Sequence, residues 1–471
     1  MQISSHLFKE KAREKLADSQ LNKALSNLRN RMVSGRAKSI EELDNFEEIR
    51  EAARQVRDLA LSHLDYLLEE FERNATARGA KVHWAATGEE VNRAVLEIAR
   101  SHRVGKIIKS KSMLGEETGL NQYLERAGIE VRETDLGEYI IQEAHETPSH
   151  IIAPAIHRTK EEVADLFHER HNLPRKTDIH EMTREARMML RPHFFTADMG
   201  VSGANFLVAE TGSSMIVTNE GNGRMTTTLP RVHVCVAGIE KVLPTLEDVS
   251  FILRLLTRSA TGQSISNYLT FTTGPRLPAE LDGPDYFHIV LVDAGRTRVL
   301  GSELRDALRC IRCGACMNHC PVYQNIGGHP YGWVYPGPIG AVLTPAYVGL
   351  ENAIDLPNAA TLCNQCGVVC PVKIPLPDLM RKLREQQVER GLRPWRERLA
   401  LRLWAWVAAR PAIYAVLSRV GVRLLHWVGG RAGLIHSLPG GAGWTRDRDM
   451  PAPSGKTFRD LHAARARNPE R

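Results

Sequence analysis

The chain has 471 residues, with 43% hydrophobic and 25% charged side chains, a net charge of +7 and a pI near 9.0. This composition is typical of a soluble globular protein and excludes disorder, collagen-like repeats and a membrane helix bundle for most of the chain. The length corresponds to about three domains. The charge is uneven, because residues 381–471 hold 19 basic and 7 acidic side chains, whereas residues 1–380 hold 43 and 48. A mildly acidic body therefore precedes a strongly basic C-terminal region.

No targeting or membrane-spanning segment is evident. The N-terminus is charged from Lys9 onward and lacks the apolar run of about 7 to 15 residues that an export signal needs. Between Leu399 and Val428 the chain is apolar, but arginines and Pro411 interrupt it well short of the ~18 residues of a spanning helix. We therefore expect a cytoplasmic protein. In that reducing compartment, closely spaced cysteines are more often metal or redox ligands than disulfides.

Residues 1–78 are predicted to be N-terminal helices. Leucines and alanines recur at helical spacing from residue 5 to residue 77, with a break expected at Ser34-Gly35 and a second helix through Leu59–Leu67. We expect these helices to pack on the domain that follows.

Residues 79–300 are predicted to form one α/β domain with a largely parallel sheet, because short β-rich runs alternate with helical stretches. The expected strands are Lys81–Ala85, Lys106–Ile108, Ile129–Arg132, His150–Ala153, Phe206–Ala209, Met215–Thr218, Val232–Ala237, Tyr268–Thr272 and Phe287–Val292. The expected helices include Glu89–Ser101, Leu120–Ala127 and Lys160–Phe167.

One candidate ligand-binding segment of this domain is Lys109, Ser110, Lys111 and Ser112. These residues follow a β run and precede a helix, a place where backbone N–H groups and lysines can bind an anion such as a carboxylate or phosphate. The alternative is a solvated loop with ordinary helix caps.

A second candidate group comprises Glu210, Thr211 and Gly212, together with Glu220. Both segments are turn-forming by composition, so each is either a pocket loop or a plain hairpin turn. No nucleotide fingerprint accompanies them, since Gly200–Gly203 lacks the G-x-G-x-x-G pattern and its acidic follower.

Seven of the eight cysteines lie between Cys310 and Cys370, in two motifs. In the first, Cys310, Cys313, Cys316 and Cys320 have the spacing C-x2-C-x2-C-x3-C and are followed by proline. This spacing is typical of bacterial two-cluster ferredoxins, in which three thiolates hold one [4Fe–4S] cube and the fourth binds the other cluster. A zinc site or a group of packing cysteines would also be compatible with clustered thiols, but zinc sites favour two separated pairs.

The second motif, Cys363, Cys366 and Cys370, lacks one ligand, because alignment on its Cys-Pro end puts Ala360 where the first cysteine should be. Crosswise ligation gives a complete [4Fe–4S] cluster to Cys310, Cys313, Cys316 and Cys370, and leaves the second cluster with Cys320, Cys363 and Cys366. The second cluster is either [3Fe–4S], or [4Fe–4S] with one iron bound to water, a non-cysteine side chain or a partner. Cys235 lies in an apolar β run and is expected to be a packing residue.

Residues 301–390 are thus predicted to be an α-helical two-cluster domain that ends in a helix over Leu376–Gln387, and residues 391–471 to be a basic, Trp-rich C-terminal region. In this region arginines interleave with Trp and Leu, as in an interfacial helix that rests on anionic lipid near a quinone pool. The alternative is a set of helices that pack on the cluster domain or on a partner. No nucleic-acid-binding module is recognisable.

With these motifs placed, the chain resembles the lactate utilization protein B family, the iron–sulfur subunit of a bacterial L-lactate oxidation complex. The resemblance covers nearly the whole chain and runs through Lys109–Met113, Ala209–Gly212, Thr218–Arg224, the two cysteine motifs and Lys456–Arg459. It implies a lactate-utilization domain related to the sugar-phosphate isomerase and CoA-transferase fold, a two-cluster ferredoxin domain and a family-specific C-terminal region. It also implies two partners, a cysteine-rich subunit and a second protein with the lactate-utilization domain.

Three functions are compatible with these features. The first is an electron-transfer subunit that carries electrons from L-lactate, oxidised to pyruvate at a site made wholly or partly by partners, to an acceptor. The second is a catalytic 2-hydroxy-acid oxidoreductase subunit with its site in the α/β domain, close to the clusters. The third is an iron–sulfur-dependent regulatory or scaffold protein. The catalytic residues, if any, are not identified by sequence.

Overall fold

The structure is a computed structural model that describes residues 3–445 and 448–467. Residues 1–2, 446–447 and 468–471, which belong to the first and last predicted regions, lie outside the described residues. The chain divides into two compact units, residues 1–387 and residues 388–471. The first unit contains both predicted sites.

The N-terminal region is helical, as predicted. Its helices are α1 (Phe8–Leu16), α2 (Ser19–Leu28), α3 (Ser34–Glu41), α4 (Phe46–Ser62) and α5 (Leu64–Ala77), with a π-helical turn over Arg29–Val33. The break expected at Ser34-Gly35 is wrong, because α3 begins there directly after that turn. Close packing of α3 on the end of α13 (Leu246–Thr261) requires glycine at position 262, where a Cβ would lie 2.4 Å from the carbonyl carbon of Gly35.

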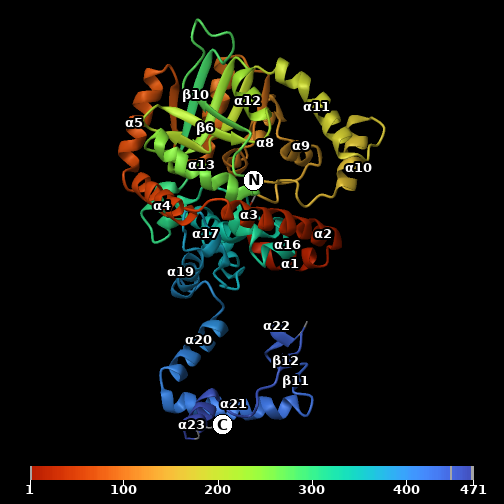
Figure 1. Ribbon diagram of the computed structural model, residues 1–471, viewed down its shortest axis with the longest axis vertical. Helices are drawn as coiled ribbons and strands as arrows, with labels where there is room; N and C mark the ends of the chain where they lie inside the picture. The colour runs from red at the N-terminus through yellow and green to blue at the C-terminus, as the bar shows by residue number, and fades with distance from the viewer. Residues whose placement is uncertain (1–2, 446–447, 468–471) are drawn as a thin grey trace. The chain divides into compact units, whose positions relative to one another are not determined.

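A six-stranded parallel sheet forms the centre of the α/β domain (Figure 1). Its order is β1-β10-β7-β4-β2-β3, with β1 Lys81–Ala85, β2 Lys106–Lys109, β3 Glu130–Glu133, β4 Met199–Gly203, β7 Val232–Gly238 and β10 Tyr286–Val292. The helices of the domain are α6 Gly88–Ser101, α7 Met113–Thr118, α8 Leu120–Arg126, α9 Leu136–Glu143, α10 Lys160–His171, α11 Ile179–Thr196, α12 Asn222–Thr228, α13 and α14 Arg296–Leu300. Helices α6 to α8 share one apolar core with the sheet, and α5 shares another with it.

The sheet arrangement differs from the expectation in three respects. A second, four-stranded sheet of order β8-β5-β6-β9 is present, with β5 Phe206–Val208, β6 Ser213–Thr218, β8 Val242–Leu243 and β9 Tyr268–Thr272. Strands β4 and β8 were not expected, because β4 is rich in glycine, which has low strand propensity, and β8 has only two residues. The strand expected at His150–Ala153 is wrong: His150 Nδ1 accepts backbone N–H groups of Ile152 and Ala153 at 3.0 and 3.1 Å, a local turn that competes with strand pairing.

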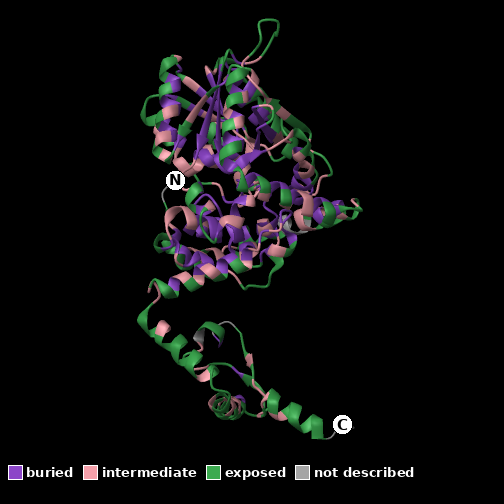
Figure 2. Ribbon diagram, turned by 90° about the vertical axis from the view of Figure 1, so that its left-hand side faces the viewer, coloured by how far each residue is buried: buried purple, intermediate pink, exposed green. Residues whose placement is uncertain are grey.

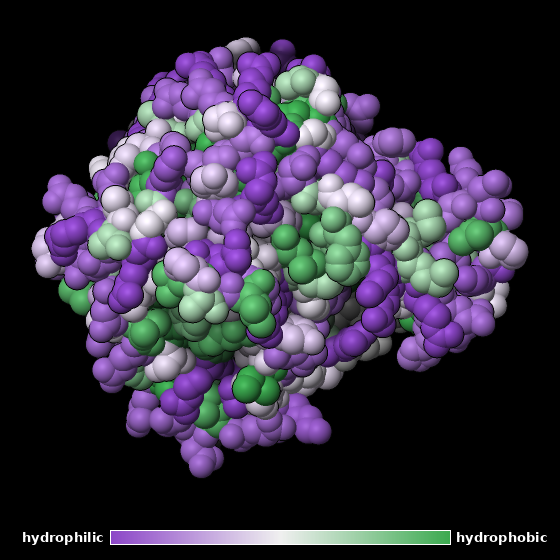
Figure 3. Space-filling model, turned by 90° about the horizontal axis from the view of Figure 1, so that it is seen from above, coloured by the Kyte–Doolittle hydropathy of each residue, from purple (hydrophilic) through white to green (hydrophobic). Residues whose placement is uncertain are grey.

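Buried residues are concentrated in the strands of the large sheet and in the cysteine-bearing segment, as Figure 2 shows. The face of the molecule seen in Figure 3 is mainly hydrophilic, with apolar side chains in small groups. The first unit therefore has the buried core and polar surface of an ordinary globular domain.

The cysteine-bearing segment is made of short helices and 3-10 turns. Its helices are α15 Ala315–Asn318, α16 Tyr323–Ile326, α17 Gly337–Val348, α18 Gln365–Val369 and α19 Leu376–Glu389. Helices α1 and α2 contact α16, and α15 contacts α18. The first N-terminal helices thus pack on the cysteine-bearing segment rather than on the domain that follows them in sequence, while α4 and α5 reach the α/β domain.

The second unit contains α20 Trp395–Ala408, α21 Pro411–Gly429, α22 Ala442–Thr445, α23 Phe458–Arg467 and the antiparallel pair β11 Leu434–Ile435 and β12 Met450–Pro451. Large apolar side chains on α20 and α21 are exposed, among them Trp404, Trp406 and Trp427. Within the part of the chain that the structure describes, no helix is both long enough and apolar enough to cross a membrane.

Candidate iron–sulfur centres and an adjacent pocket

The seven clustered cysteines line two separate cavities. Cavity A is lined by Cys310, Cys313, Cys316 and Cys370, and cavity B by Cys320, Cys363 and Cys366. These are the two sets of thiols that crosswise ligation predicts, since Cys320 and Cys370 each face the cavity of the other motif. All seven are free thiols, so both cavities present donors suited to iron–sulfur clusters.

The backbone of the two motifs repeats the same conformation. Arg312 and Leu362, each just before the second cysteine position, have φ of +60° and +56°, and Gly314 and Asn364, each just after it, have φ of +75° and +64°. Left-handed conformations are uncommon in non-glycine residues and occur where the surrounding structure requires them. The repeat supports the alignment that puts Ala360 at the position of Cys310.

Cavity B has no evident substitute for the missing cysteine. Its lining contains Ala360 at the aligned position, and the remaining polar residues are Thr361, Asn364 and Gln365. Among its described lining residues there is no imidazole or carboxylate, the side chains that can replace thiolate as iron ligands. Cys235 belongs to the core between α5 and the sheet and lines neither cavity.

Local hydrogen bonds and burial set the state of these thiols. The backbone N–H groups of Arg312 and Ile374 donate to the sulfurs of Cys310 and Cys370, each at 3.4 Å. Burial raises the pKa of Cys313 to about 12, so that bound iron would have to displace its proton. Cys363 differs, because a hydrogen bond from the Thr361 side chain lowers the pKa of this exposed thiol.

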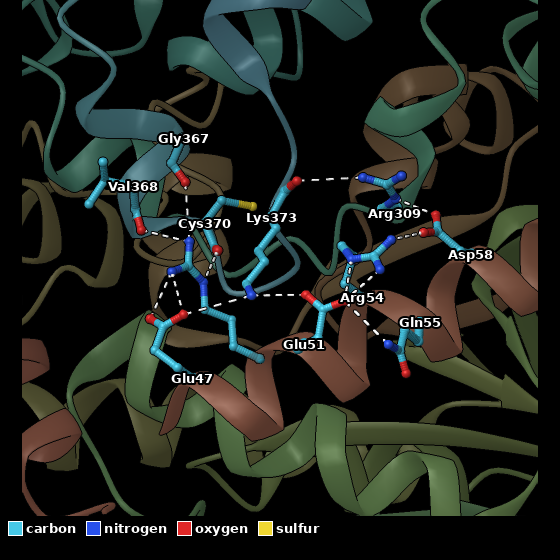
Figure 4. A network of polar contacts seen from close by, with 11 residues as sticks. Glu47, Glu51, Arg54, Gln55, Asp58, Arg309, Gly367, Val368, Cys370 and Lys373 are labelled. Atoms are coloured by element: carbon cyan, nitrogen blue, oxygen red, sulfur yellow. Dashed lines mark hydrogen bonds and ion pairs between the residues drawn. The ribbon is translucent and has the colours of Figure 1, made fainter. Parts of the chain in front are cut away.

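Arg50 of α4 fastens the N-terminal helices to the second cysteine motif (Figure 4). Its guanidinium donates to the carbonyl oxygens of Cys370 and Val368, both at 2.7 Å, and of Gly367 at 3.2 Å. Glu47 accepts from its remaining nitrogen at 2.9 Å. Nine-tenths of the Arg50 side chain is buried, so these charge-assisted bonds hold the motif in place.

A second set of ion pairs in Figure 4 reaches the first motif. Asp58 of α4 pairs with Arg54 at 2.5 Å and with Arg309, the residue before Cys310. Lys373, just beyond the second motif, pairs with Glu51 at 2.9 Å. Helix α4 therefore holds the ends of both motifs, a connection that spacing alone does not reveal.

A pocket lies where the parallel strands β2, β4 and β7 end. Its volume is about 340 Å³, within the range of small-molecule sites. Ligands of open α/β sheets bind at this edge. Polar and charged lining residues include Ser110, Lys111, Ser112, Asp135, Asn205, Thr218, Asn219, Glu220, Asn222, Glu240, Lys241, Gln263, Ser266, Arg296, Arg312 and Tyr335. We call this cavity the sheet-edge pocket.

A buried ion-pair network forms one wall of the sheet-edge pocket. Arg296 makes a bidentate pair with Glu117, both contacts at 3.0 Å, and donates to Glu240 at 2.8 Å. The Tyr335 hydroxyl donates to Glu117 at 2.7 Å, and Arg312 lies 4.4 Å over the Tyr335 ring. Burial raises the pKa of Glu240, but the neighbouring Arg296 has the stronger opposite effect and lowers this pKa to about 2. The Glu240 carboxylate is therefore ionised.

The sheet-edge pocket and cavity A share part of their walls. Ile151 and Arg312 line both cavities, and Arg312 stands between Cys310 and Cys313 in sequence. The cysteines of cavity A are therefore close neighbours of any molecule bound at the edge of the sheet.

The structure divides the predicted ligand residues of the α/β domain. Ser110, Lys111, Ser112 and Glu220 line the sheet-edge pocket, whereas Lys109 is buried and pairs with Glu133 and Glu116. Ser112 is also the N-cap of α7, so the pocket loop and the helix cap are the same feature.

Glu210, Thr211 and Gly212 form the turn between β5 and β6, outside the sheet-edge pocket. Glu210 accepts from the N–H of Leu246 at 2.9 Å, and the Asn74 side chain donates to the Ala209 carbonyl at 2.8 Å. These contacts make the segment a structural turn that joins α5 and α13.

Sequence reasoning missed the charged residues Glu240, Lys241, Arg296 and Arg312 of this pocket. The signal for the first two was available, because they directly follow a continuous apolar strand and so stand at the carboxyl end of a parallel sheet. Arg296 has a weaker form of the same signal, four residues after the apolar strand β10, whereas Arg312 reaches the pocket from the cysteine-bearing segment and carries none.

Three family descriptions match this chain. The LUD domain matches residues 68–292, the 4Fe-4S dicluster domain matches residues 306–374, and the C-terminal domain of lactate utilisation protein B matches residues 379–467. The predicted resemblance is thereby confirmed, as are an α/β domain with a parallel sheet and a domain for iron–sulfur clusters.

Relatives match along almost the whole chain. Lactate utilization protein B of Shouchella clausii is 43% identical over 99% of this chain and 98% of its own length. An "Uncharacterized electron transport protein YkgF" of Escherichia coli is 43% identical over 96% of this chain and 95% of its own. A crystal structure of a DUF162 family protein from Deinococcus radiodurans aligns with 49% of this chain and 98% of its own at 15% identity, with a TM-score of 0.28.

Proposed function

The chain belongs to the lactate utilization protein B family, and from this premise we propose that it is the iron–sulfur electron-transfer subunit of a system that oxidises L-lactate to pyruvate. Its relatives carry lactate utilization and electron transport in their names, and its own sequence contains a 4Fe-4S dicluster domain.

Cavity A would hold a [4Fe–4S] cluster on Cys310, Cys313, Cys316 and Cys370. Cavity B would hold its cluster on Cys320, Cys363 and Cys366, either as [3Fe–4S] or as [4Fe–4S] with one iron not bound by cysteine. The donor sets of the two cavities support this assignment. When bound, the two clusters supply a pair of one-electron carriers for a substrate that loses two electrons.

One observation carries the proposal: the two thiol sets have opposite surroundings. Cavity A shares Ile151 and Arg312 with the sheet-edge pocket, whereas Cys363 of cavity B is exposed to solvent. A relay needs one end near the electron donor and one end that a partner can reach. Leu362, which lines cavity B, and Val368, which lies on the same short helix as Cys366, are exposed apolar side chains that suit the cysteine-rich partner subunit that the family implies.

Lactate-dependent dye reduction by anaerobically purified protein tests this role. We expect no reduction by the chain alone and reduction when the cysteine-rich subunit and the second lactate-utilization-domain protein are added. Full activity of the chain alone would instead favour the second candidate, a 2-hydroxy-acid oxidoreductase with its substrate site in the α/β domain, to which the pocket beside cavity A lends support.

We further propose that the second unit contacts an anionic membrane surface. Arginines such as Arg402, Arg410 and Arg423 accompany exposed tryptophans on α20 and α21, a combination that suits lipid headgroups. Flotation with anionic vesicles should recover the full chain and not a chain that lacks residues 393–471. Equal recovery of both, or of neither, would contradict the proposal and favour packing against a protein partner.

A further inference from the structure

We propose that the sheet-edge pocket is a binding site for a small carboxylate, with Lys241 and Arg312 as the groups that hold the carboxylate. Only the identity of that carboxylate as a 2-hydroxy or 2-oxo acid, L-lactate or pyruvate, rests on the proposed function. The binding site itself rests on the charges, the partners and the position of the pocket.

Buried positive charge exceeds buried negative charge beside this pocket. Lys241, Arg296 and Arg312 line the pocket, Arg57 lies beside Lys241, and the carboxylates Glu117 and Glu240 are both engaged by Arg296. Burial lowers the pKa of Lys241 to about 7, so an anion in the pocket favours its charged form. Burial of unpaired charge is costly unless an opposite charge or hydrogen-bond partners compensate it.

Arg57 and Arg296 are satisfied within the chain. Arg57 donates to the backbone carbonyls of Glu240, Val242 and Leu308, and Arg296 donates to its two carboxylates. Every nitrogen of both guanidinium groups already donates to an acceptor within the chain. The two cations that remain are Lys241 and Arg312.

Lys241 stands in the pocket lining with 9% of its surface exposed. Its ammonium lies 5.7 Å from the centre of the Phe206 ring, and among the described residues it has no hydrogen-bond acceptor. An ammonium has three donors, so a buried one facing a pocket is suited to an anion that enters it.

Arg312 also has an unused donor. Its Nη1 is buried with no partner among the described residues, while its Nη2 lies 3.6 Å from Glu240. The ring of Tyr335 stacks on one face of the guanidinium and fixes its plane. A guanidinium fork held in this way favours a planar carboxylate.

The rest of the pocket suits a hydroxy acid. Ser110, Asn205 and Thr218 provide hydroxyl and amide groups for a second oxygen, and Val236 and Ile216 provide apolar surface for a methyl group. A carboxylate at Lys241 and Arg312 would thus lie at the wall shared with cavity A.

A competing explanation is that these cations serve only the thiolates. Cys310 is close enough to Lys241, Arg57 and Arg312 to affect the pKa of each. That explanation predicts that loss of Lys241 changes the reduction potential of the cluster in cavity A and leaves the affinity for a carboxylate unchanged.

Calorimetric titration of the full chain, purified anaerobically with its clusters, distinguishes a carboxylate-binding site from cations that serve only the thiolates. Pyruvate, L-lactate and inorganic phosphate are titrated separately into the oxidised protein, so that pyruvate binding is measured without turnover. We expect pyruvate and L-lactate to bind at one site and more tightly than phosphate, and Lys241→Met to weaken both at least about tenfold, the effect of one charge-assisted hydrogen bond.

Lys241→Arg should restore part of the affinity. Lys106→Met, at the other end of β2 and paired with Glu130, is the matched control and should bind as the unaltered chain does. Unchanged affinity in Lys241→Met, tighter binding of phosphate, or a shifted potential without loss of binding would each overturn the proposal. Pyruvate binding without lactate-dependent dye reduction by the chain reconstituted with its two partners would instead count against the proposed function alone.

Discussion

The two cysteine motifs have nearly the same spacing, but the two cavities that they form lie in opposite environments. Cavity A is lined by four thiols and by buried apolar residues such as Ile339 and Ile374, and lies next to a charged pocket. Cavity B is lined by three thiols and uncharged polar groups, and Cys363 faces solvent. The comparison indicates that burial and neighbouring charge, and not the ligand spacing, make one cavity suited to a buried pocket and the other to a solvent-exposed surface.

The arginines make the contrast sharper. Arg36 and Arg50 donate to carbonyls of the second motif near Cys370, and Arg57 and Arg312 lie near Cys310, so positive charge surrounds cavity A. Positive charge and hydrogen bonds to sulfur stabilise the reduced, more negative state of a cluster. A cluster held in cavity A would therefore have its potential set by the chain itself, whereas one in cavity B would be open to the influence of solvent or a partner.

The largest expected effect comes from removal of one ligand from each cavity. Cys313→Ala should abolish lactate-dependent dye reduction by the reconstituted complex and lower the thermal stability, because a buried cluster supports the core around it. Cys363→Ala should also abolish reduction but lower the thermal stability less, because cavity B is open to solvent at Cys363 and its cluster supports less of the core.

Iron content and the unfolding temperature are the measurements, with Cys235→Ala as a control that should retain all iron. Equal losses of thermal stability in Cys313→Ala and Cys363→Ala would contradict the prediction that the more buried cavity A contributes more to the stability of the fold.

A smaller effect is expected from the arginine that ties α4 to cavity A. Arg50→Ala should lower the free energy of unfolding by about 3 kcal/mol, because buried carbonyls lose charge-assisted hydrogen bonds worth ~1.5–3 kcal/mol each and regain only part of this from water. Arg54→Ala, on the same helix, should cost less than about 1 kcal/mol because its ion pairs are partly exposed. Denaturant unfolding measures both; similar losses would show that Arg50 does not hold the motif.

The apolar surface beside cavity B should contribute less, and only to partner binding. Val368 is 57% exposed, so Val368→Ser should weaken binding of the cysteine-rich subunit about tenfold, or ~1.4 kcal/mol, and leave unfolding unchanged. Leu59→Ser removes a similarly exposed side chain from α4 and is the control. A surface-immobilised binding assay in which the two variants behave alike would place the partner elsewhere.

The family, the α/β domain and the dicluster domain could be predicted from sequence, because strand alternation and cysteine spacing are local patterns. The candidate loop Ser110–Ser112 was found for the same reason, since it directly follows a strand. Lys109 and Glu210 lie in equally polar stretches of sequence, but neither lines the pocket. Lys109 is buried and forms an ion pair with Glu133, and Glu210 accepts a hydrogen bond from the backbone N–H of Leu246 at the start of α13.

The charged wall of the sheet-edge pocket could not be predicted in the same way. Glu117 and Arg296 are far apart in sequence and pair inside the α/β domain, and Arg312 and Tyr335 join them only when the cysteine-bearing segment packs against that domain. The placement of α4 against both motifs is also a tertiary fact, expressed in long-range contacts such as that of Arg50 with Cys370. Spacing identifies the ligands, whereas Arg36, Arg50 and Arg57, which place positive charge around cavity A, come from distant segments.

The smallest change, Ala360→Cys, tests whether the two cavities differ because of one missing ligand. Ala360 lines cavity B at the place that corresponds to Cys310, and the matching backbone conformations of the two motifs put a new thiol where a fourth ligand belongs. We expect electron paramagnetic resonance and Mössbauer spectra of the unaltered chain to reveal a second cluster that differs from the first, and those of the variant to reveal two [4Fe–4S] clusters. A serine at the same position should not convert the spectrum, because a neutral hydroxyl is a poor ligand for iron beside thiolate. Two fully cysteine-ligated cubes in the unaltered chain would remove the distinction between the cavities, and an unconverted variant would place the open position elsewhere in cavity B.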